Sequence, residues 1–362
     1  MTSSVELTMA QDTPYFRRET SGIDEDGRLT CTYMGVAEGL TYIAPYVETA
    51  LLPPGEQHSS VTIRETDLVR SWRDTRSDLA VLVAHDTDLG SLQLASDLHA
   101  VARIHQVVPT GDGWDSVRRR MSRREVRRGE KARQDGFHYD VSNRDDDFRF
   151  FYNRMHRPTM ARRYGMHARS VPEDEAFRDL FRKGVLFRIL YRGTWVAGSV
   201  SQVAPADRRL NARLIGVRDG DESYTRLGAQ NFVYHSILDW ATQQGSISEV
   251  DFQGCEPFLS KGTFQYKKRF GATARLPDNI FGSLRMVIRA DLRRMSVRDF
   301  LVSNPYITMS DDKDLCAVYC FDSVRPPRLD LPYASPGIAG HRVLDLDALA
   351  DSQAVAPQHA SD

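Results

Sequence analysis

The sequence is poor in cysteine and lysine, and it has no long apolar run. The four cysteines among its 362 residues show no regular spacing: Cys31, Cys255, Cys316 and Cys320. This usage excludes a disulfide framework and a zinc-ligand pattern, so we expect no metal and a reducing, cytoplasmic setting. Because no 18-residue window is apolar throughout, we expect no transmembrane helix and no membrane partner. The polar N-terminus does not have the pattern of a secretory signal.

Charge of neither sign dominates, since 48 Lys and Arg residues face 49 Asp and Glu residues. This balance argues against a protein wholly committed to nucleic acid, but it allows a local basic patch. Arginine is the usual cation, and two of the few lysines, Lys267 and Lys268, are adjacent. A lysine can approach a carbonyl oxygen as a compact donor, so this pair stands out chemically.

Hydrophobic periodicity predicts a mixed α/β protein with two folded parts. Residues 1–28 are polar and indicate a mobile arm. Residues 29–115 predict a small mixed unit, in which 40–52 is compatible with either strand or helix. Residues 116–322 predict a larger unit, and the breaker-rich tail 323–362 suggests disorder or surface wrapping.

The larger unit begins with a very basic stretch, which predicts one helix over 116–134. Like charges at i,i+4 destabilise such a helix, and an anionic partner would relieve the repulsion. The candidate phosphate contacts are Arg120, Arg123, Arg124, Arg127, Arg128 and Lys131. Two interpretations stay open: a solvated arginine-rich face, or a helix whose guanidinium groups grip RNA phosphates.

Further elements follow in a regular order. A strand precedes an amphipathic helix that is interrupted at Pro158, which places Arg163 and Tyr164 near the break. A second helix, a hairpin around 192–194 and a third strand come next. One long helix over 223–245 carries His235 and leads into the strand 249–254.

That last strand opens into a loop with a compact aromatic and basic cluster. Asp251 lies on the strand, Glu256 in the loop, and Tyr266, Lys267 and Lys268 in the cluster. Ligands of open α/β sheets commonly bind at such strand ends. The alternative is a solvated surface turn.

Two pieces together resemble a known family. RREVRRGEKARQDGFHYDV resembles the entry segment of the Fem-type (FemABX-like) aminoacyltransferases, and DFQGCEPFLSKGTFQYKKRFG resembles the end of the same domain. These proteins belong to the wider GNAT superfamily of N-acyltransferases. The resemblance covers about 118–271, and the element order fits it. It implies tandem GNAT-like units, each a central mixed sheet flanked by helices, with a degenerate first unit.

The resemblance also implies a function: transfer of an aminoacyl group from charged tRNA to an amine, without a further cofactor. The absence of a heptad run favours a small-molecule acceptor over cell-wall work. Lys267 or Lys268 would stabilise the reacting carbonyl, and Asp251 or Glu256 would take the amine proton. The candidate substrate contacts are Tyr266, Tyr164, Arg163 and His235, of which His235 is also compatible with a packed core residue.

Acyl-CoA remains the alternative donor. The segment before the long helix reads RDGDESYTRLGAQ, a poor match to a pyrophosphate-binding loop, and its Asp219, Asp221 and Glu222 would repel a pyrophosphate. A non-catalytic RNA-binding module is a third possibility, distinguished by binding RNA while leaving aminoacyl esters intact.

Overall fold

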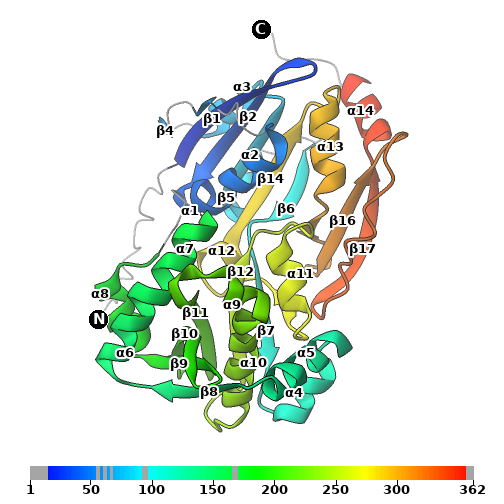
Figure 1. The fold of residues 1–362 in the computed structure, drawn as a ribbon. Coiled ribbons are helices and arrows are strands. Elements are labelled where there is room, and N and C mark those ends of the chain that lie inside the picture. Colours follow the sequence, from blue (N-terminus) through cyan, green and yellow to red (C-terminus); the bar gives the residue numbers. More distant parts are fainter. Residues whose placement is uncertain are drawn as a thin grey trace, which may run out of the picture.

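Three sheets with helices on their faces make up the protein. The computed structural model describes residues 15–53, 58–59, 63–65, 68–91, 97–164 and 170–355. Figure 1 shows the first sheet at the top, the second at the bottom and a small third sheet on the right. The predicted mixed α/β class, with central mixed sheets flanked by helices, is confirmed.

The first sheet has the order β3-β1-β2-β5-β14-β6, with β4 paired to β1. Its strands are β1 (Tyr15–Asp24), β2 (Gly27–Val36), β3 (His58–Ser59), β4 (Ile63–Glu65), β5 (Leu79–His85), β6 (Leu98–Val101) and β14 (Leu284–Ala290). Its helices are α1 (Ala37–Tyr42), α2 (Ala44–Leu51), α3 (Leu68–Asp74) and α12 (Ile280–Ser283), with the short turn η1 (Asp86–Ser91). The stretch 40–52, left open between strand and helix, is helical.

The second sheet has the order β13-β7-β12-β11-β10-β9-β8. Its strands are β7 (Ile104–Pro109), β8 (Phe137–Ser142), β9 (Gly184–Tyr191), β10 (Thr194–Ala204), β11 (Arg209–Val217), β12 (Glu249–Cys255) and β13 (Thr273–Arg275). The hairpin β9–β10 turns at Arg192 and Gly193, which both have positive φ. Only β11 and β12 run parallel; the other neighbours are antiparallel.

Helices cover both faces of this second sheet. One face carries α4 (Trp114–Arg120), α5 (Arg123–Gln134), α9 (Glu222–Leu227) and α10 (Ala229–Thr242). The other carries α6 (Asp145–Phe151), the π-helical turn η2 (Tyr152–His156), α7 (Arg157–Tyr164), α8 (Glu173–Glu175) and the π-helical turn η4 (Ala176–Phe181). Neighbouring strand residues point to opposite faces, so Leu186 packs under η2 and Phe187 under α10.

The two large sheets exchange strands. β7 follows the first unit in the chain but pairs with β12 and β13 of the second sheet. β14 follows the second unit but lies between β5 and β6 of the first sheet. Residues 98–109 form two strands, β6 and β7, which separate at Ala102 and Arg103. The predicted boundary at residue 115 therefore places β7 in the first unit, although β7 belongs to the second sheet.

Both ends of the described chain are more ordered than the sequence suggests. The predicted arm 1–28 contains β1, which pairs with β2 over its whole length; residues 1–14 lie outside the described part. The tail 323–362, for which the sequence suggests disorder or surface wrapping, contains β17 (Ile338–Asp345) and α14 (Leu346–Val355). β17 pairs in parallel with β16 (Leu315–Phe321), which also pairs with β15 (Tyr306–Met309). α13 (Met295–Ser303) and Leu346 of α14 pack into the core of the first unit.

Two predicted helices are each broken into two. The basic stretch divides at Met121 and Ser122, and the Ser122 hydroxyl accepts a hydrogen bond from Glu125 N, which starts α5 afresh. The long helix divides at Gly228, whose φ of 95° is in the left-handed region. Both breaks create new helix N-termini, those of α5 and α10, which the periodicity alone does not indicate.

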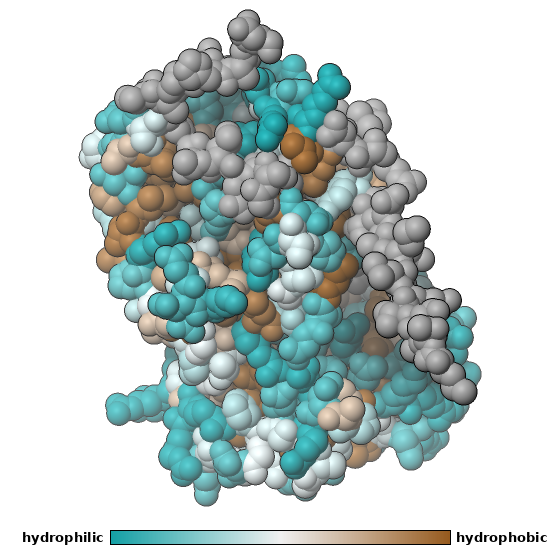
Figure 2. Space-filling view, turned by 180° about the vertical axis from the view of Figure 1, so that it is seen from behind, coloured by the Kyte–Doolittle hydropathy of each residue, from teal (hydrophilic) through white to brown (hydrophobic). Residues whose placement is uncertain are grey.

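The surface differs between the two parts. Seen from behind, the apolar surface gathers mainly in the upper half, whereas the lower half, over the second sheet, is dominated by hydrophilic residues (Figure 2). In the described ranges, no helix combines the length and the apolar character needed to span a bilayer.

Candidate active site

The central feature of the second sheet is the parting of its two parallel strands. β11 pairs with β12 only from Arg209 to Asn211, although β11 continues to Val217 and β12 to Cys255. A bulge in β12 between Asp251 and Gly254 accompanies the parting. Bulges re-aim strands and commonly lie next to active sites. The strands therefore form a V that opens at their carboxyl ends.

A cleft of about 1140 Å³ occupies this opening. Its walls come from both faces of the sheet: His156 and Met160 on one side, Asn231 and Tyr266 on the other. Arg103, from the link between β6 and β7, closes part of it and stacks at 4.4 Å on the Tyr42 ring. The cleft thus passes through the sheet, so two substrates could enter from opposite faces and meet between the strands.

Lys267 lies in the wall of this cleft at the end of α11 (Gly262–Lys268). Its side chain is 4% exposed, and its ammonium donates to Gln253 O at 2.7 Å and to Gly254 O at 3.4 Å. Burial lowers the Lys267 pKa, which the negative charges of Asp251 and Glu256 oppose. Since an ammonium has three donors, one N–H remains for a ligand.

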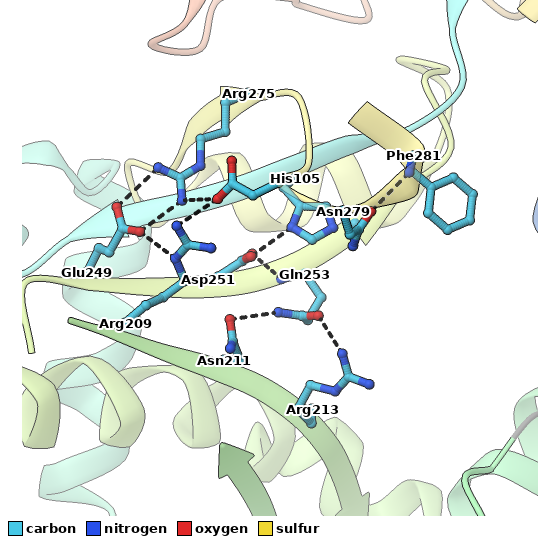
Figure 3. A network of polar contacts seen from close by, with 12 residues as sticks. His105, Arg209, Asn211, Arg213, Glu249, Asp251, Gln253, Arg275, Asn279 and Phe281 are labelled. Carbon is cyan, nitrogen blue, oxygen red and sulfur yellow. Dashed lines mark hydrogen bonds and ion pairs between the residues drawn. The ribbon is translucent and has the colours of Figure 1, made fainter. Parts of the chain in front are cut away.

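A polar network holds the strands where they part (Figure 3). His105 of β7 donates from Nδ1 to Asp251 Oδ2 at 2.7 Å, and Asp251 Oδ1 accepts from Gln253 N at 2.6 Å. Burial raises the Asp251 pKa, but the His105 interaction and the other bonds outweigh it, so the pKa is lowered. The Gln253 amide then bridges to β11, donating to Asn211 Oδ1 at 3.3 Å and accepting from Arg213 at 3.1 Å.

A second buried network centres on Glu125 of α5. Its Oε1 accepts from Asn231 Nδ2 at 2.6 Å and from His235 Nε2 at 3.1 Å. Asn231 Nδ2 also donates to the Tyr266 hydroxyl at 3.1 Å. Burial raises the Glu125 pKa, but these donors and the charge of Arg128 outweigh it and lower the pKa. The network joins α5, α10 and α11 behind the cleft wall.

Basic side chains of α5 line the same cleft. They are Arg124, Arg127, Arg128 and Lys131. Arg124 and Arg127 are exposed and form no ion pair within the described chain, whereas Arg128 lies 3.8 Å from Glu125 Oε2. Arg127 also borders a second hollow of about 530 Å³, lined by Arg118, Arg119 and Arg123. A continuous basic surface therefore leads from the outside of α4–α5 into the cleft.

The N-terminus of α10 also opens into the cleft. Gly228, Gln230 and Asn231 line it, and no side chain caps this helix start. Uncapped N–H groups at a helix N-terminus favour anions. The three acidic residues expected to repel a pyrophosphate do not line the cleft: Asp219 pairs with Arg154, Glu222 with Arg162, and Asp221 caps α9. That electrostatic objection to acyl-CoA does not hold.

On the opposite face, η2 lies directly against β11. His156 Nδ1 is 3.1 Å from Ile215 O, and the Thr159 hydroxyl bonds to both N and O of Val217. A Cβ on Gly216 would lie 2.4 Å from the main-chain carbon of Met155, so only glycine allows this approach. The edge of β11 that β12 leaves free is thus partly taken by η2 and α7.

Residues 116–268 match the family profile described as an acetyltransferase (GNAT) domain. This region, fewer than half of the 362 residues, resembles a GNAT domain. The matched range includes α5, the parting strands, α10 and Lys267, so the cleft lies almost entirely within it. Over this range the match agrees with the GNAT superfamily resemblance of the sequence. No curated protein sequence matches the chain.

Solved structures similar to the chain are distant. L-PGS from Bacillus licheniformis is 8% identical over 80% of this chain and 88% of its own, with a TM-score of 0.40. FemX is 10% identical over 75% and 88%, with a TM-score of 0.41. A GCN5-related N-acetyltransferase from Kribbella flavida is 10% identical over 72% and 80%, with a TM-score of 0.30. At these values the likenesses carry no statement about activity.

The GNAT-like region brings some of the predicted site residues together. Lys267, Tyr266 and Arg163 line the cleft, as do four of the predicted RNA contacts, Arg124, Arg127, Arg128 and Lys131. Tyr164 ends α7, and its side chain lies outside the described part. Arg123 lies in the outer hollow.

Other predicted residues of the GNAT-like region lie elsewhere. Lys268 points away and donates to Pro332 O at 2.6 Å. Asp251 is buried behind Gln253, and Glu256 pairs with Lys261 at 3.3 Å, so neither carboxylate faces the cleft.

Two further predictions conflict with packing. His235 is a buried core residue held by Glu125, and it does not line the cleft. Arg120 donates to Pro109 O and to Ser116 Oγ, and its backbone packs against Gly271, so it serves the fold rather than phosphate binding.

Sequence reasoning missed four residues of the GNAT-like region and its flank: His105, Glu125, His156 and Gln253. For Glu125 a signal existed, because Ser122 and Glu125 form the S-x-x-E pattern of a helix start. His105, His156 and Gln253 act through partners 40 or more positions away, which no local pattern reveals. The described residues include no cluster of His, Cys, Asp and Glu suited to a metal ion.

Proposed function

We propose that this protein is an aminoacyltransferase that moves an aminoacyl group from charged tRNA to the amine of a small molecule. The observation that carries the proposal is the basic wall of the cleft, formed by Arg124, Arg127, Arg128 and Lys131 and continuous with the arginines outside α4–α5. A single pyrophosphate needs only a few donors. A basic surface of this extent suits a polyanion with many phosphates.

The size of the cleft supports the same proposal. At about 1140 Å³ it exceeds the roughly 300–1,000 Å³ typical of small-molecule pockets. It can hold the terminal nucleoside of a tRNA with its ester-linked amino acid and still admit an acceptor from the other face of the sheet.

Lys267 supplies the catalytic electrostatics in this proposal. The ester carbonyl lies beside its remaining N–H, and the ammonium stabilises the negative charge that develops on the carbonyl oxygen. The acceptor nitrogen attacks the carbonyl carbon, a C–N bond forms, the ester C–O bond breaks, and the 3′-hydroxyl of the tRNA leaves. Gln253 O and Gly254 O fix the lysine for this task.

A binding experiment distinguishes aminoacyl-tRNA from acyl-CoA as the donor. Purified protein is titrated with aminoacyl-tRNA and with acetyl-CoA at one moderate salt concentration, beside an R124Q/R127Q variant. A matched control, R293Q/R328Q, removes the same charge at positions outside the cleft. We expect tRNA binding that weakens at least tenfold in R124Q/R127Q and not in the control. Equal tRNA affinity in all three proteins would contradict the proposal.

An acyl-CoA-dependent N-acyltransferase is the second candidate, favoured by the uncapped N-terminus of α10 in the cleft. It predicts saturable acetyl-CoA binding that the R124Q/R127Q change leaves intact. Transfer assays with labelled aminoacyl-tRNA and a panel of amines then test for amide formation. Binding of tRNA without loss of the ester would instead indicate a non-catalytic RNA-binding module.

A further inference from the structure

Acyl transfer to an amine requires a group that takes up a proton, and few side chains in the cleft can do so. In the described part of the chain, the non-cationic titratable side chains that line it are Tyr42, Asp135, His156, Tyr234 and Tyr266. Tyrosines remain protonated at neutral pH. Asp135 is exposed at the end of α5 and holds Lys131 at 3.0 Å. His156 is the one that remains.

The hydrogen bond of His156 defines its tautomer. Nδ1 lies 3.1 Å from Ile215 O, and because a carbonyl oxygen only accepts, Nδ1 carries the proton. In the neutral ring, Nε2 then presents a lone pair. The residue is 3% exposed, and the buried Nε2 has no hydrogen-bond partner among the described residues, although His156 lines the cleft. A buried nitrogen without a partner is costly unless a ligand or water meets it.

The position of His156 is fixed by main-chain packing rather than by its own bond alone. η2 contacts β11 at Gly216, where a Cβ would lie 2.5 Å from His156 N, and Thr159 holds Val217 one residue further. π-Helical turns inside α-helices are frequent at functional sites, because the extra residue re-aims a side chain. Here the turn ends on His156 itself.

The surroundings keep the ring neutral. Burial lowers the His156 pKa, and the bond to Ile215 opposes this only in part. Its charged neighbours are cationic or already paired. Arg154 is paired with Asp219 at 2.7 Å, while Arg163 of α7 and Arg213 of β11 lie in the same cleft. The Tyr152 ring lies tilted against the imidazole, with the ring centroids 5.6 Å apart.

We propose that His156 Nε2 accepts the proton of the acceptor amine, directly or through one water. The inference rests on the proposed transfer of an acyl group to an amine, but it does not depend on which donor brings that group. The proposal assigns the two catalytic roles to the two parting strands. The proton acceptor, His156, is anchored on β11 through Ile215, and the carbonyl-stabilising Lys267 is anchored on β12 through Gln253. The acceptor enters from the η2 face and the donor from the α5 and α10 face.

The protons balance over the whole step. An acceptor ammonium loses two protons when it becomes an amide. One passes to Nε2 and from there to water. The other leaves the tetrahedral adduct with the departing oxygen, which becomes the free hydroxyl of the tRNA. No oxidant, reductant or metal is required.

The tautomer is tested without substrate, by nitrogen NMR on histidine-labelled full-length protein, with His156 signals assigned by their absence in H156N. Asparagine keeps a donor near the place of Nδ1 and lacks Nε2. We expect an unprotonated Nε2 and a protonated Nδ1 from pH 7 to 8. A protonated Nε2 in this range would overturn the proposal, whether or not any donor is turned over.

Kinetics test the role, with whichever of aminoacyl-tRNA or acetyl-CoA supports turnover. We expect kcat of H156N to fall about 100-fold or more, with KM values for both substrates within about threefold. The rate of the native protein should rise with pH through an acidic limb that H156N loses. H138N, the same change on the exposed outer strand β8, is the control and should behave like the native protein.

These outcomes separate the two proposals. Turnover with acetyl-CoA alone would reject tRNA as donor and leave the His156 test intact. An H156N variant that keeps kcat within threefold would reject His156 as proton acceptor. So would loss of the acidic limb in K267M instead of H156N, since Lys267 would then be the base. If neither donor reacts, the nitrogen spectrum alone decides.

Discussion

Lys267 donates to the main-chain oxygen of Gln253 at 2.7 Å, and that bond ties the end of α11 to the bulge in β12. The lysine is therefore both held by the strand and presented to the cleft. Its neighbour in sequence, Lys268, makes its contact with Pro332 instead. The two adjacent ammonium groups thus bind different parts of the chain, and only that of Lys267 lines the cleft. Substituting each lysine separately tests this difference.

Replacing Lys267 with methionine should remove the charge near the reacting carbonyl while filling the same space. We expect kcat/KM to fall about 10²–10³-fold, the usual loss for one oxyanion-stabilising donor. K268M is the matched control and should keep turnover within about twofold. Steady-state transfer assays give both numbers, and thermal unfolding checks that both variants fold. Equal losses in the two variants would remove the distinction between the lysines.

The basic wall predicts a specific salt dependence. Each phosphate contact contributes about 0.7–0.9 to the slope of log affinity against log salt. Removing Arg124 and Arg127 together should therefore lower the slope for tRNA by about 1.4 to 1.8, measured by titration at several salt concentrations. A variant whose affinity falls uniformly without a change in slope would show that these arginines act by some route other than phosphate contact.

Glu125 predicts a large effect on stability. Truncation to alanine would leave Asn231 and the buried His235 without their acceptor, and hydrogen bonds to charged groups are worth about 1.5–3 kcal/mol each. We expect E125A to lose about 3 kcal/mol in urea unfolding, and E125Q less because its amide oxygen can still accept. E130A, on the exposed side of the same helix, should change stability by under about 1 kcal/mol.

Asp251 predicts how stability depends on pH. Its pKa in the folded protein is lowered, so its contribution is present above the unfolded pKa of about 4 and is lost as pH falls through the lower folded value. D251N should be less stable at pH 7 by about 1.5–3 kcal/mol and should show a shallower loss of stability on acidification. Unfolding midpoints measured from pH 7 to 3 check both. An unchanged acid slope would show that other carboxylates dominate.

The close packing of η2 on Gly216 leads us to expect that a side chain at this position would lower the reaction rate. A methyl group there would have to push η2 from β11, because the main chain of Met155 lies 2.4 Å from the added carbon. We expect G216A to lower kcat at least tenfold and to lose more than 1 kcal/mol of stability. G245A meets no atom within 4 Å and should leave activity unchanged. An active, stable G216A would mean that the contact adjusts freely.

Local patterns were sufficient for the elements that alternate or repeat regularly. The β9–β10 hairpin, strand β12 and the mixed α/β class follow from periodicity and turn residues, and the two motif pieces led to the GNAT superfamily. The prediction of helix over 116–134 had the right type but missed the break at Ser122, because a solvated arginine face continues across it without a change in period. The break at Gly228 was missed because glycine is also tolerated inside helices.

The site itself could be predicted only in part. Lys267 and the arginines of α5 stood out by residue type, but their access to a common cleft depends on tertiary packing. Asp251 and His235 were chosen as candidates because carboxylates and imidazoles commonly transfer protons. Their burial beside His105 and Glu125 depends on contacts between residues far apart in the sequence, which no local pattern reveals. Disorder, one of the two alternatives for the tail, was suggested by its prolines, whereas β17 gains its stability from pairing with β16.

The exchange of β7 and β14 has a consequence for how the molecule can be divided. A fragment cut to the GNAT match would omit β7 and β13, leaving β12 with an exposed hydrogen-bonding edge beside the cleft. The remaining first unit would in turn lose β14 from between β5 and β6. Neither half is a transferable module. The geometry of the cleft therefore depends on the whole chain, and heat or denaturant should unfold both halves in one cooperative transition.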